Sequence, residues 1–395
     1  MRNALATNLS DLLRYQNMLC RYDTMALKSL DIFSVHGFPV GLVQCESNFL
    51  GIVDQNKGAN IGSGGWANII EKYTKAKTYC DHPFEVAYRD GKAVRIPMHG
   101  EWIGDHRNGT HPHERRSLVL CCQSATVAEL PPVSLDAVIT DPPYFGNVQY
   151  AELMDVCYVW LRRLVGSTVE AFTAASTRHA SELTGNVTME RDLSHFTTGL
   201  SEVFCRMARA LKPGAPFTFT YHHNTLDAYY PIAVAILDAG FVCSASFPCP
   251  AEMGGSIHIN KTGSSIVDTV FVCRSTGKVP RRWIAETPED IAVLACEDLA
   301  YLRAGTVTPT RGDLRCIIFG HIVRMAIWHL RHTWNRDCAV AEKLTTVAHY
   351  IYQHGGLQAV EQYLKADLAQ MPQGQRAGIQ EDEIPYRIRE DDIPF

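Results

Sequence analysis

Residues 134–144 read SLDAVITDPPY, and the expected fold depends on this stretch. The apolar run that ends at Thr140 predicts a buried strand, and the tetrapeptide DPPY predicts that the strand stops there. Residues 150–165, YAELMDVCYVWLRRLV, follow with apolar side chains at helical spacing. The expected buried stripe of this helix contains Leu153, Val156, Tyr158 or Val159, Trp160 and Leu164. A strand, a loop and a helix in this order are the unit from which parallel sheets are built.

Strands and helices continue to alternate on the carboxyl-terminal side of this unit. The sequence predicts helices at residues 193–211 and 229–240, and strands at residues 216–223, 241–247 and 269–275. On the amino-terminal side, the run SLVLCCQSA also predicts a strand. Such alternation indicates an α/β fold with a mostly parallel sheet that is covered by helices on both faces.

Composition divides the chain into four parts. Residues 1–110 contain one helical stretch near residues 9–27 and otherwise polar, glycine-rich sequence. Residues 111–278 form the expected α/β domain, and residues 279–370 predict a helical subdomain. Residues 371–395 are polar, acidic and proline-bearing, which is typical of a disordered tail.

The overall composition excludes several classes of protein. With 46% apolar and 20% charged residues, most of the chain is not expected to be disordered. Thirteen cysteines in a long chain without an apolar leader segment indicate reduced thiols and a cytoplasmic location. No apolar run reaches the length of about 18 residues that a membrane-spanning helix needs, so we expect no membrane association.

The net charge of −5 is unevenly distributed. Residues 381–395 hold six acids against two arginines, so the rest of the chain is nearly neutral. Proteins that bind nucleic acid by neutralising its phosphates are often basic overall. A nearly neutral body is nevertheless compatible with DNA contact through a local basic patch.

The tetrapeptide Asp141, Pro142, Pro143, Tyr144 is the leading candidate for a functional site. Open α/β sheets bind their ligands just beyond the carboxyl ends of strands, and the tetrapeptide occupies such a position. The alternative is an ordinary Pro-Pro turn with a tyrosine at the surface. The strand before the tetrapeptide and the amphipathic helix after it favour the ligand site.

The tetrapeptide resembles motif IV of the amino-methyltransferases, which use S-adenosylmethionine to methylate the exocyclic amine of adenine or cytosine in DNA. An aryl amine is a poor nucleophile because its lone pair is delocalised into the ring. The resemblance implies that the Asp141 carboxylate and the Pro142 carbonyl accept hydrogen bonds from this amine. It also implies that Pro143 helps to hold that carbonyl rigidly and that the Tyr144 ring stacks on a flipped base.

The likeness extends beyond four residues. Residues 136–163, DAVITDPPYFGNVQYAELMDVCYVWLRR, are similar to the segment DPPYYDNVxYxxLxDFFYVWLRR of a family of large bacterial and archaeal adenine-specific DNA methylases. Residues 211–241 and 307–323 resemble later blocks of that family. The resemblance implies a Rossmann-like class I methyltransferase sheet, complete or incomplete, that acts on N6 of adenine in DNA with S-adenosylmethionine as the cofactor.

Four further residues are candidates for substrate binding: Asn147, His222, His223 and Glu252. Asn147 matches the family segment just after the tetrapeptide. The two histidines end a predicted strand on the same edge as Asp141, and the alternative is one packed and one solvated histidine. Glu252 matches a family glutamate, and a loop carboxylate without function is the alternative.

The chain departs from this family in the donor-binding loop. Family members have a loop of the DPFAGGGS kind, whose glycines let the backbone approach the donor, and this chain has none. Either a second polypeptide supplies the donor half, or Gly62, Gly64 and Gly65 with Glu46 replace it, or the protein no longer turns over. The glycine segment is otherwise an ordinary loop that leads into a helix.

Two other functions stay open at this point. Cytosine presents the same kind of amine, so the tetrapeptide also suits cytosine-N4 methylation. A non-catalytic DNA-binding or adaptor subunit, or a remnant methylase, is compatible with the missing donor loop. No metal is expected, because His321, His329 and His332 do not have the one-turn spacing of a helical metal site.

The last residues, QEDEIPYRIREDDIPF, repeat an element in which acids precede Ile-Pro and an aromatic residue. The second copy, which ends at Phe395, is similar to the acidic tip of bacterial single-stranded-DNA-binding proteins. This resemblance implies a docking peptide whose terminal aromatic enters an apolar pocket of a partner protein. A solubilising acidic tail is the alternative.

Overall fold

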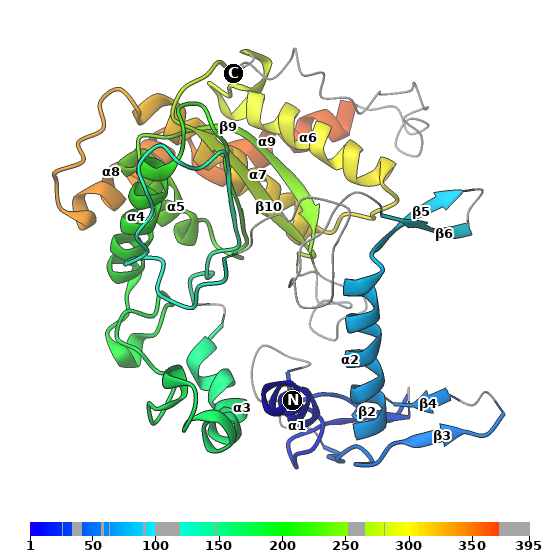
Figure 1. Ribbon diagram of the computed structural model, residues 1–395. Coiled ribbons are helices and arrows are strands. Elements are labelled where there is room, and N and C mark those ends of the chain that lie inside the picture. Colours follow the sequence, from blue (N-terminus) through cyan, green and yellow to red (C-terminus); the bar gives the residue numbers. More distant parts are fainter. Residues whose placement is uncertain are drawn as a thin grey trace. The chain divides into compact units, whose positions relative to one another are not determined.

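The computed structural model describes most of the chain in two compact units (Figure 1). Undescribed residues are 26, 34–41, 57–58, 63, 90–91, 99–118, 147, 252–264, 280 and 371–395. The candidates Asn147 and Glu252 and the expected disordered tail therefore lie outside the described residues. The first unit comprises Met1–Gln123 and Tyr150–His179, and the second comprises Ser124–Gln149 and Ala180–Phe395. The four-part division expected from composition stays a prediction.

Three helices form the centre of the first unit: α1 (Arg2–Leu13), α2 (Trp66–Asp81) and α3 (Tyr150–Val165). Helix α1 contacts both of the others, and the buried side chains of Leu12, Ile69 and Leu153 belong to the three helices in turn. Antiparallel two-stranded ribbons pair β1 (Tyr22–Asp23) with β2 (Lys28–Ser29), β3 (Ile52–Asp54) with β4 (Ala59–Ile61), and β5 (Phe84–Arg89) with β6 (Lys92–Pro97).

Two sequence predictions for the first unit are wrong. The helix expected near residues 9–27 lies earlier, at α1, because the Asn17 side chain donates to the carbonyl of Leu13 (2.9 Å) and ends the helical ladder. The predicted strand SLVLCCQSA has no strand conformation in its described part, where Val119 and Leu120 are exposed. A short apolar run alone does not provide a pairing partner.

The buried face of α3 also differs from the expected stripe. Leu153 and Tyr158 are buried as predicted, together with Ala151 and Val165, whereas Val159 and Trp160 are about half exposed. The face is set by contact with α1, which the periodicity of α3 alone does not reveal.

The second unit contains a mixed four-stranded sheet in the order β7-β8-β10-β9. Its strands are β7 (Val138–Thr140), β8 (Phe217–Tyr221), β9 (Val242–Pro250) and β10 (Val267–Arg274). Strands β7 and β8 are parallel, whereas β10 is antiparallel to both β8 and β9. The sequence predicts a mostly parallel sheet. This prediction is correct for β7, β8 and β9, which run in the same direction, and wrong for β10, which runs in the opposite direction.

The connections explain these directions. Helix α5 (Tyr230–Asp238) joins β8 to β9, and such a crossover allows the two strands to run the same way. No helix is described between β9 and β10, which pair directly as antiparallel neighbours. The sequence pattern predicted the strands. It did not predict that β10 lies between β8 and β9 and runs antiparallel to both.

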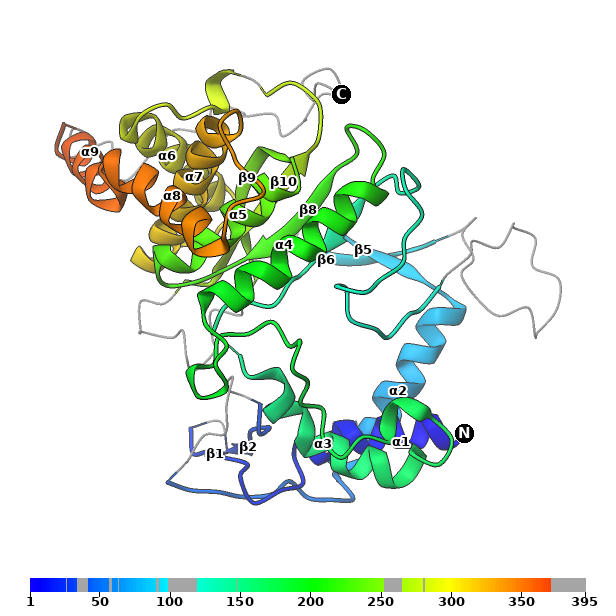
Figure 2. The same ribbon diagram turned by 90° about the vertical axis from the view of Figure 1, so that its left-hand side faces the viewer.

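Aromatic side chains fill the core around this sheet. The rings of Phe219 and Phe271 stack with centroids 5.2 Å apart, and those of Phe217 and Phe241 stack at 5.3 Å. Phe204, from helix α4 (Leu193–Ala210), packs on Phe217 at 4.6 Å. Figure 2 shows α4 running alongside β8.

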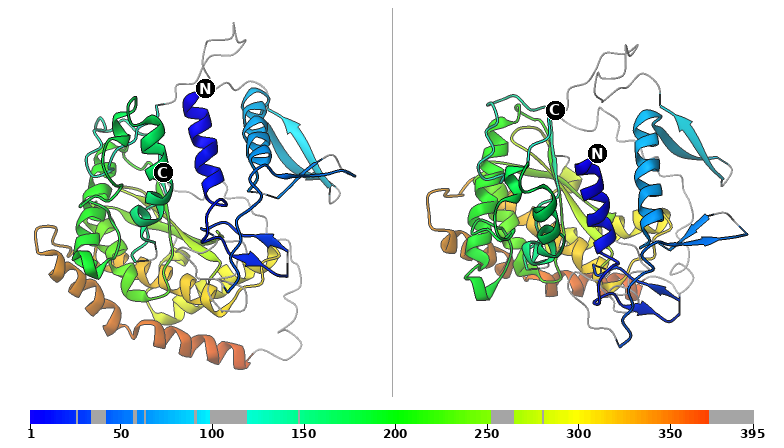
Figure 3. Two further views of the ribbon diagram at one scale, coloured as in Figure 1. Left: turned by 90° about the horizontal axis from the view of Figure 1, so that it is seen from below. Right: turned by 60° about the horizontal axis from the view of Figure 1, so that its bottom comes forward.

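Four helices follow the sheet as expected: α6 (Pro288–Ala304), α7 (Arg311–Leu330), α8 (Val340–Gln353) and α9 (Gly356–Gln370). Helix α7 contacts β9 and β10, and α5 contacts α4, α7 and α8. Helices α8 and α9 follow one another along the border of this unit (Figure 3, orange to red). Short 3-10 helices lie at Glu170–Phe172, Val187–Met189, Leu226–Tyr229 and Arg281–Trp283.

Buried polar groups fix the helices to the sheet and to one another. Asp313 caps α7 with Thr310 and also accepts hydrogen bonds from Ser265 Oγ and the Ile266 N–H, both at 2.8 Å. In a second cluster, Asp238 of α5 pairs with Lys343 of α8 at 3.0 Å. Because both members of this pair are buried, each requires the other.

The described fold is thus α/β, with about 46% helix and a mixed sheet. Among the described residues, no helix has both the length and the apolar character needed to cross a membrane. All thirteen cysteines lie in the described part of the chain, and each is a free thiol.

Candidate functional site

The Tyr144 hydroxyl joins residues from three strands or strand ends. It lies 3.0 Å from Oδ1 of Asp141, 3.1 Å from Oγ1 of Thr220 and 2.9 Å from Oδ2 of Asp268. Thr220 Oγ1 also donates to Oδ1 of Asp141. We call these four side chains the Tyr144 cluster. All of them belong to the second unit.

Strand register brings the cluster to one end of the sheet. Asp141 directly follows β7, whose last residue, Thr140, is paired with Phe219 of β8, the neighbour of Thr220. On the other side of β8, Tyr221 is paired with Thr269 of β10, the neighbour of Asp268. The carboxyl ends of β7 and β8 and the amino end of β10 therefore meet at this edge, where α/β sheets place ligand sites.

The hydrogen bonds hold Asp141 by one oxygen only. Tyr144 and Thr220 both reach Oδ1. Oδ2 has no hydrogen-bond partner within the described part of the chain, and Asp141 is exposed. Thr220 donates to Oδ1, and the single proton of the Tyr144 hydroxyl is shared between Oδ1 of Asp141 and Oδ2 of Asp268. These contacts orient the carboxylate through Oδ1 and leave Oδ2, among the described residues, available to an incoming N–H or O–H.

Tyr144 itself is half-buried, and its ring packs edge-on against Tyr221 with centroids 5.3 Å apart. Burial raises the pKa of the Tyr144 hydroxyl well above its ordinary value, and the charges of Asp268 and Asp141 raise this pKa further. The hydroxyl therefore keeps its proton at neutral pH. Stacking of this ring on a base stays a prediction, and the contacts assign Tyr144 a positioning role toward Asp141.

The rest of the tetrapeptide and its loop are partly buried. Pro142 is buried and Pro143 is half-buried, which restrains the backbone next to Asp141. The ring of Phe145 packs on Phe196 of α4 at 5.4 Å, so the loop after the tetrapeptide is fixed to a helix. Gly146 has φ +69°, a backbone conformation that other residues rarely adopt.

The two candidate histidines lie at the end of β8, each with structural partners. His222 Nδ1 is 3.2 Å from the carbonyl of Val267 on β10. His223 Nδ1 accepts from the N–H of Thr225 at 3.0 Å, and the His223 ring lies 6.5 Å from that of Phe145. Burial lowers the pKa of His223, so the ring is neutral at pH 7. His223 adjoins the loop of the tetrapeptide through Phe145, and substrate binding by either histidine stays a prediction.

The glycine segment in the first unit is accounted for by packing. A Cβ on Gly64 would meet Ser47 and Tyr15, and a Cβ on Gly65 would lie 2.5 Å from Cα of Gly51. Gly62 is exposed and has φ +86°. The segment leads into α2, which the sequence analysis gave as the alternative to nucleotide binding.

The first backbone donors of α2 are also occupied. The Trp66 N–H donates to the carbonyl of Phe49 at 2.7 Å, and the Ala67 N–H donates to that of Leu50 at 3.4 Å. A loop that holds a phosphate or a nucleotide needs such N–H groups free. The described contacts thus give the segment a packing role.

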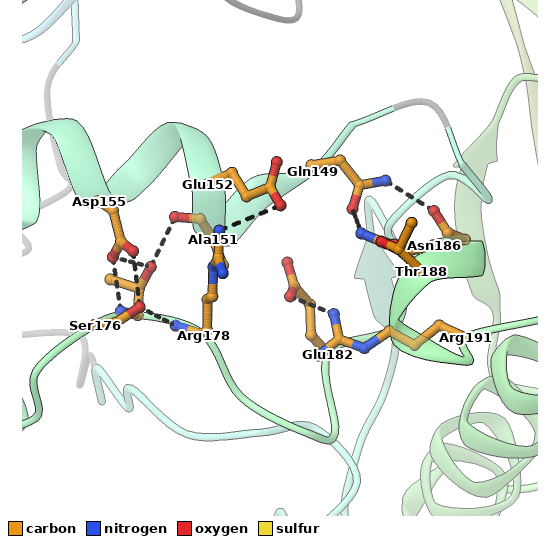
Figure 4. Close-up of polar contacts among 12 residues, drawn as sticks. Gln149, Ala151, Glu152, Asp155, Ser176, Arg178, Glu182, Asn186, Thr188 and Arg191 are labelled. Atoms are coloured by element: carbon orange, nitrogen blue, oxygen red, sulfur yellow. Dashed lines mark hydrogen bonds and ion pairs between the residues drawn. The ribbon is translucent and has the colours of Figure 1, made fainter.

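Figure 4 shows two polar clusters, one in each unit, that hold the segments after α3. In the first unit, Asp155 accepts from Ser176 Oγ and from the Thr177 N–H, both at 2.7 Å. Burial by itself raises the pKa of Asp155, but these hydrogen bonds outweigh the effect of burial, so the pKa is lowered. In the second unit, Arg191 pairs with Glu182 at 2.7 Å. Asp155, one of the family matches, therefore anchors a turn.

Sequence reasoning missed Thr220 and Asp268. Thr220 lies in the alternating run FTFTY, and Asp268 interrupts the apolar run VDTVFVC. A charged residue at the start of an otherwise apolar strand was the available signal for Asp268. Its proximity to Asp141 depends on the placement of β10 beside β8, which a single sequence does not provide.

Among the described residues, no group of three or more His, Cys, Asp or Glu side chains is arranged to hold a metal ion. In comparisons with protein-family models, curated proteins and solved structures, none matched this chain.

Proposed function

We propose that the chain is the base-binding half of an S-adenosylmethionine-dependent DNA methyltransferase that acts on N6 of adenine. One observation carries the proposal: the Asp141 carboxylate is oriented through Oδ1 at the end of β7, and no described residue occupies its Oδ2. The sequence resemblance at residues 136–163 supplies the reaction class. A Rossmann-like class I methyltransferase sheet is part of the proposal, and the strand order β7-β8-β10-β9 with β10 reversed is compatible with it.

The chemistry needs an acceptor that is fixed before the base arrives. An adenine amine donates one N–H to Oδ2 of Asp141 and the other to the carbonyl of Pro142, and both bonds draw its lone pair out of the ring. Tyr144 and Thr220 prevent the carboxylate from turning away, so little reorganisation is required during the reaction. A hydrogen bond to a charged group contributes about 2 kcal/mol, which is more than tenfold in rate or affinity.

The glycine segment does not fit the methyl donor. Its buried glycines, Gly64 and Gly65, pack against other backbone and side chains, and the N–H groups that follow them are already bonded. In the proposed enzyme, a second polypeptide therefore binds the donor.

The free edge of the sheet supports such a partner. Strand β7 pairs with β8 alone among the described strands, and Ile139 at its centre is 83% exposed. An apolar side chain is seldom exposed in the middle of a strand, and unpaired strand edges are sites of strand addition. The non-catalytic adaptor remains the rival function, because a glycine segment that does not fit the donor is compatible with both functions.

The test is methyl transfer with the complete system. The chain is incubated with DNA, S-adenosylmethionine and the products of its neighbouring genes, and the methylated bases are identified by mass spectrometry. We expect N6-methyladenine with the wild-type chain, at least a 100-fold loss with Asp141→Asn, and wild-type activity with Asp136→Asn, an exposed control whose carboxylate pairs with Lys212. Equal activity of both variants would contradict the role of Asp141. N4-methylcytosine as the product, or no transfer at all, would favour a rival function.

A further inference from the structure

Two buried cysteines lie opposite one another in the sheet of the second unit. Cys243 of β9 is paired with Cys273 of β10, and their side chains are 5% and 0% exposed. The register shifts by one residue between Val272 and Cys273, and this bulge brings Cys243 instead of Ser244 opposite Cys273. Opposed residues of antiparallel strands have Cα atoms about 4.5 to 5.5 Å apart, which is within the range of about 4.4 to 6.8 Å that a disulfide needs.

The two thiols also contact each other. The Cys273 thiol donates a hydrogen bond to the Cys243 sulfur. In its own thiol form, Cys243 donates to the carbonyl of Ala245 at 3.2 Å. The sulfurs are therefore held next to one another, in positions from which a bond between them requires little movement of the strands.

A cavity gives the Cys243 sulfur access to small molecules. Its walls include Cys243 of β9, Leu294 of α6, Trp283, and the α7 residues His321, Arg324 and Trp328. Trp283 and Trp328 are half-buried, so the cavity borders on the surface. Its space suffices for about one water-sized molecule. The cavity thus admits a molecule as small as hydrogen peroxide and excludes bulky reagents.

The charge beside Cys243 is positive. The Arg324 guanidinium is buried and donates to the carbonyl of Trp283 at 2.8 Å. Within the described residues no carboxylate forms an ion pair with Arg324, and Asp298, whose charge reaches it, is paired with His321 at 2.8 Å. A buried cation needs an opposite charge, and a Cys243 thiolate supplies one.

The two thiols differ in how readily they lose a proton. Burial by itself raises the pKa of Cys243, but the hydrogen bond from Cys273 and the charge of Arg324 outweigh burial and lower this pKa. Burial raises the pKa of Cys273, and its hydrogen bond to Cys243 raises it further. Cys243 is therefore the thiol that ionises first, with a protonated thiol beside it.

We propose that hydrogen peroxide oxidises Cys243 and that Cys273 then forms a disulfide with it. The Cys243 thiolate attacks one peroxide oxygen, the O–O bond breaks, and the sulfur becomes a sulfenic acid while the other oxygen leaves as hydroxide beside Arg324. The Cys273 sulfur then attacks the Cys243 sulfur, the S–O bond breaks, and the hydroxide leaves with the Cys273 proton as water. A dithiol reductant restores both thiols.

The proposal is independent of the methyltransferase activity, because none of these groups belongs to the Tyr144 cluster. It assigns the pair Cys243 and Cys273 as a reversible oxidation site. The bond would join two neighbouring strands of the sheet within the buried core.

The test treats the folded full chain with hydrogen peroxide, blocks the remaining thiols under denaturing conditions and maps linked peptides by mass spectrometry. Cys316 is the internal control, because it is also buried (1% exposed) and burial raises its pKa to about 11. We expect the link between Cys243 and Cys273 to form at least about tenfold faster than any oxidised form of Cys316, since the thiolate fraction falls tenfold per pKa unit.

Two variants separate the two steps. Cys273→Ser should stop at a sulfenic acid on Cys243, which dimedone traps, and Cys243→Ser should leave Cys273 unmodified. The matched control is Cys205→Ser on α4, which should form the link at the wild-type rate. Replacing hydrogen peroxide by the bulky cumene hydroperoxide should slow the reaction about tenfold or more, because the cavity excludes it. Circular dichroism checks that the variants fold.

The wild type alone can overturn the proposal, whatever the variants do. Peroxide that leaves Cys243 neither linked to Cys273 nor oxidised to a sulfenic acid would contradict it, as would oxidation of Cys316 at the same rate. Oxidation of Cys273 at the wild-type rate in folded Cys243→Ser would contradict the assignment of Cys243 as the thiol that meets the peroxide.

Discussion

The hydroxyl of Tyr144 lies 3.0 Å from Oδ1 of Asp141, so the last residue of the tetrapeptide holds the first. The same carboxylate oxygen accepts from Thr220, and Oδ2 has no partner in the part of the chain that the structure describes. A carboxylate with one fixed and one open oxygen is suited to receive a donor from a ligand.

Replacing Thr220 by valine keeps the shape of the side chain and removes the hydroxyl that donates to Oδ1 of Asp141. We expect methyl transfer by the complete system to fall about tenfold, because a hydrogen bond to a charged group is lost, while the free energy of unfolding falls by only about 1 kcal/mol. The control is Thr218→Val on the same strand, which should change neither quantity. Equal activity of Thr220→Val and the wild type would show that Asp141 needs no hydrogen bond from Thr220.

The raised pKa of Tyr144 predicts a pH dependence of stability. A group whose pKa is higher in the folded chain stabilises it below the unfolded pKa, about 10 for tyrosine, and this contribution is lost as the pH rises through the folded pKa. Urea titrations above pH 10 should therefore show a steep loss of stability in the wild type. In Tyr144→Phe the unfolding free energy should fall less steeply with pH, and the difference in slope should correspond to about one bound proton. An identical slope in both proteins would contradict the buried, protonated hydroxyl.

The ion pair of Asp238 and Lys343 should stabilise the second unit strongly. Lys343→Met leaves a buried carboxylate that keeps only its hydrogen bond from Trp334 Nε1 (2.9 Å), and we expect a loss of about 3 kcal/mol in urea denaturation. The double variant with Asp238→Asn should recover most of this loss, because no charge is then left unpaired. A larger loss in the double variant than in the single one would contradict this account.

Gly64 should be required for packing. In Gly64→Ala the added methyl group meets Ser47 and Tyr15, so we expect a loss of about 2 kcal/mol. Gly62→Ala meets no neighbouring atom and has only the cost of its positive φ, so its loss should be about 1 kcal/mol. Thermal unfolding of both variants measures the difference. A larger loss for Gly62→Ala would argue against the packing role of Gly64.

Much of the second unit was predictable from local patterns. The run before Asp141 and the alternating run FTFTY correspond to β7 and β8, and Gly240 with φ +74° follows the end of α5 as expected. Each of these signals lies within a few residues of the element that it predicts. Local periodicity therefore sufficed for them.

The remaining features depend on contacts between distant residues. Val119 and Leu120 resemble a strand in composition, but they are exposed and pair with no strand that the structure describes. Trp160 lies outside the buried face because α1 determines which side of α3 is covered. Asp268 approaches Asp141 only because β10 lies beside β8. For the β5–β6 ribbon the signal was present, since an Asp-Gly pair between two extended runs is typical of a hairpin.

The most direct test of the central claim needs only the full chain and two single-stranded oligonucleotides. They differ at one target base, which is adenine in one and purine, without the 6-amino group, in the other. The account predicts that the wild type binds the adenine oligonucleotide about tenfold more tightly and that Asp141→Asn loses most of this preference. Equal binding of the two oligonucleotides by the wild type, or an unchanged preference in Asp141→Asn, would contradict recognition of the amine by Asp141.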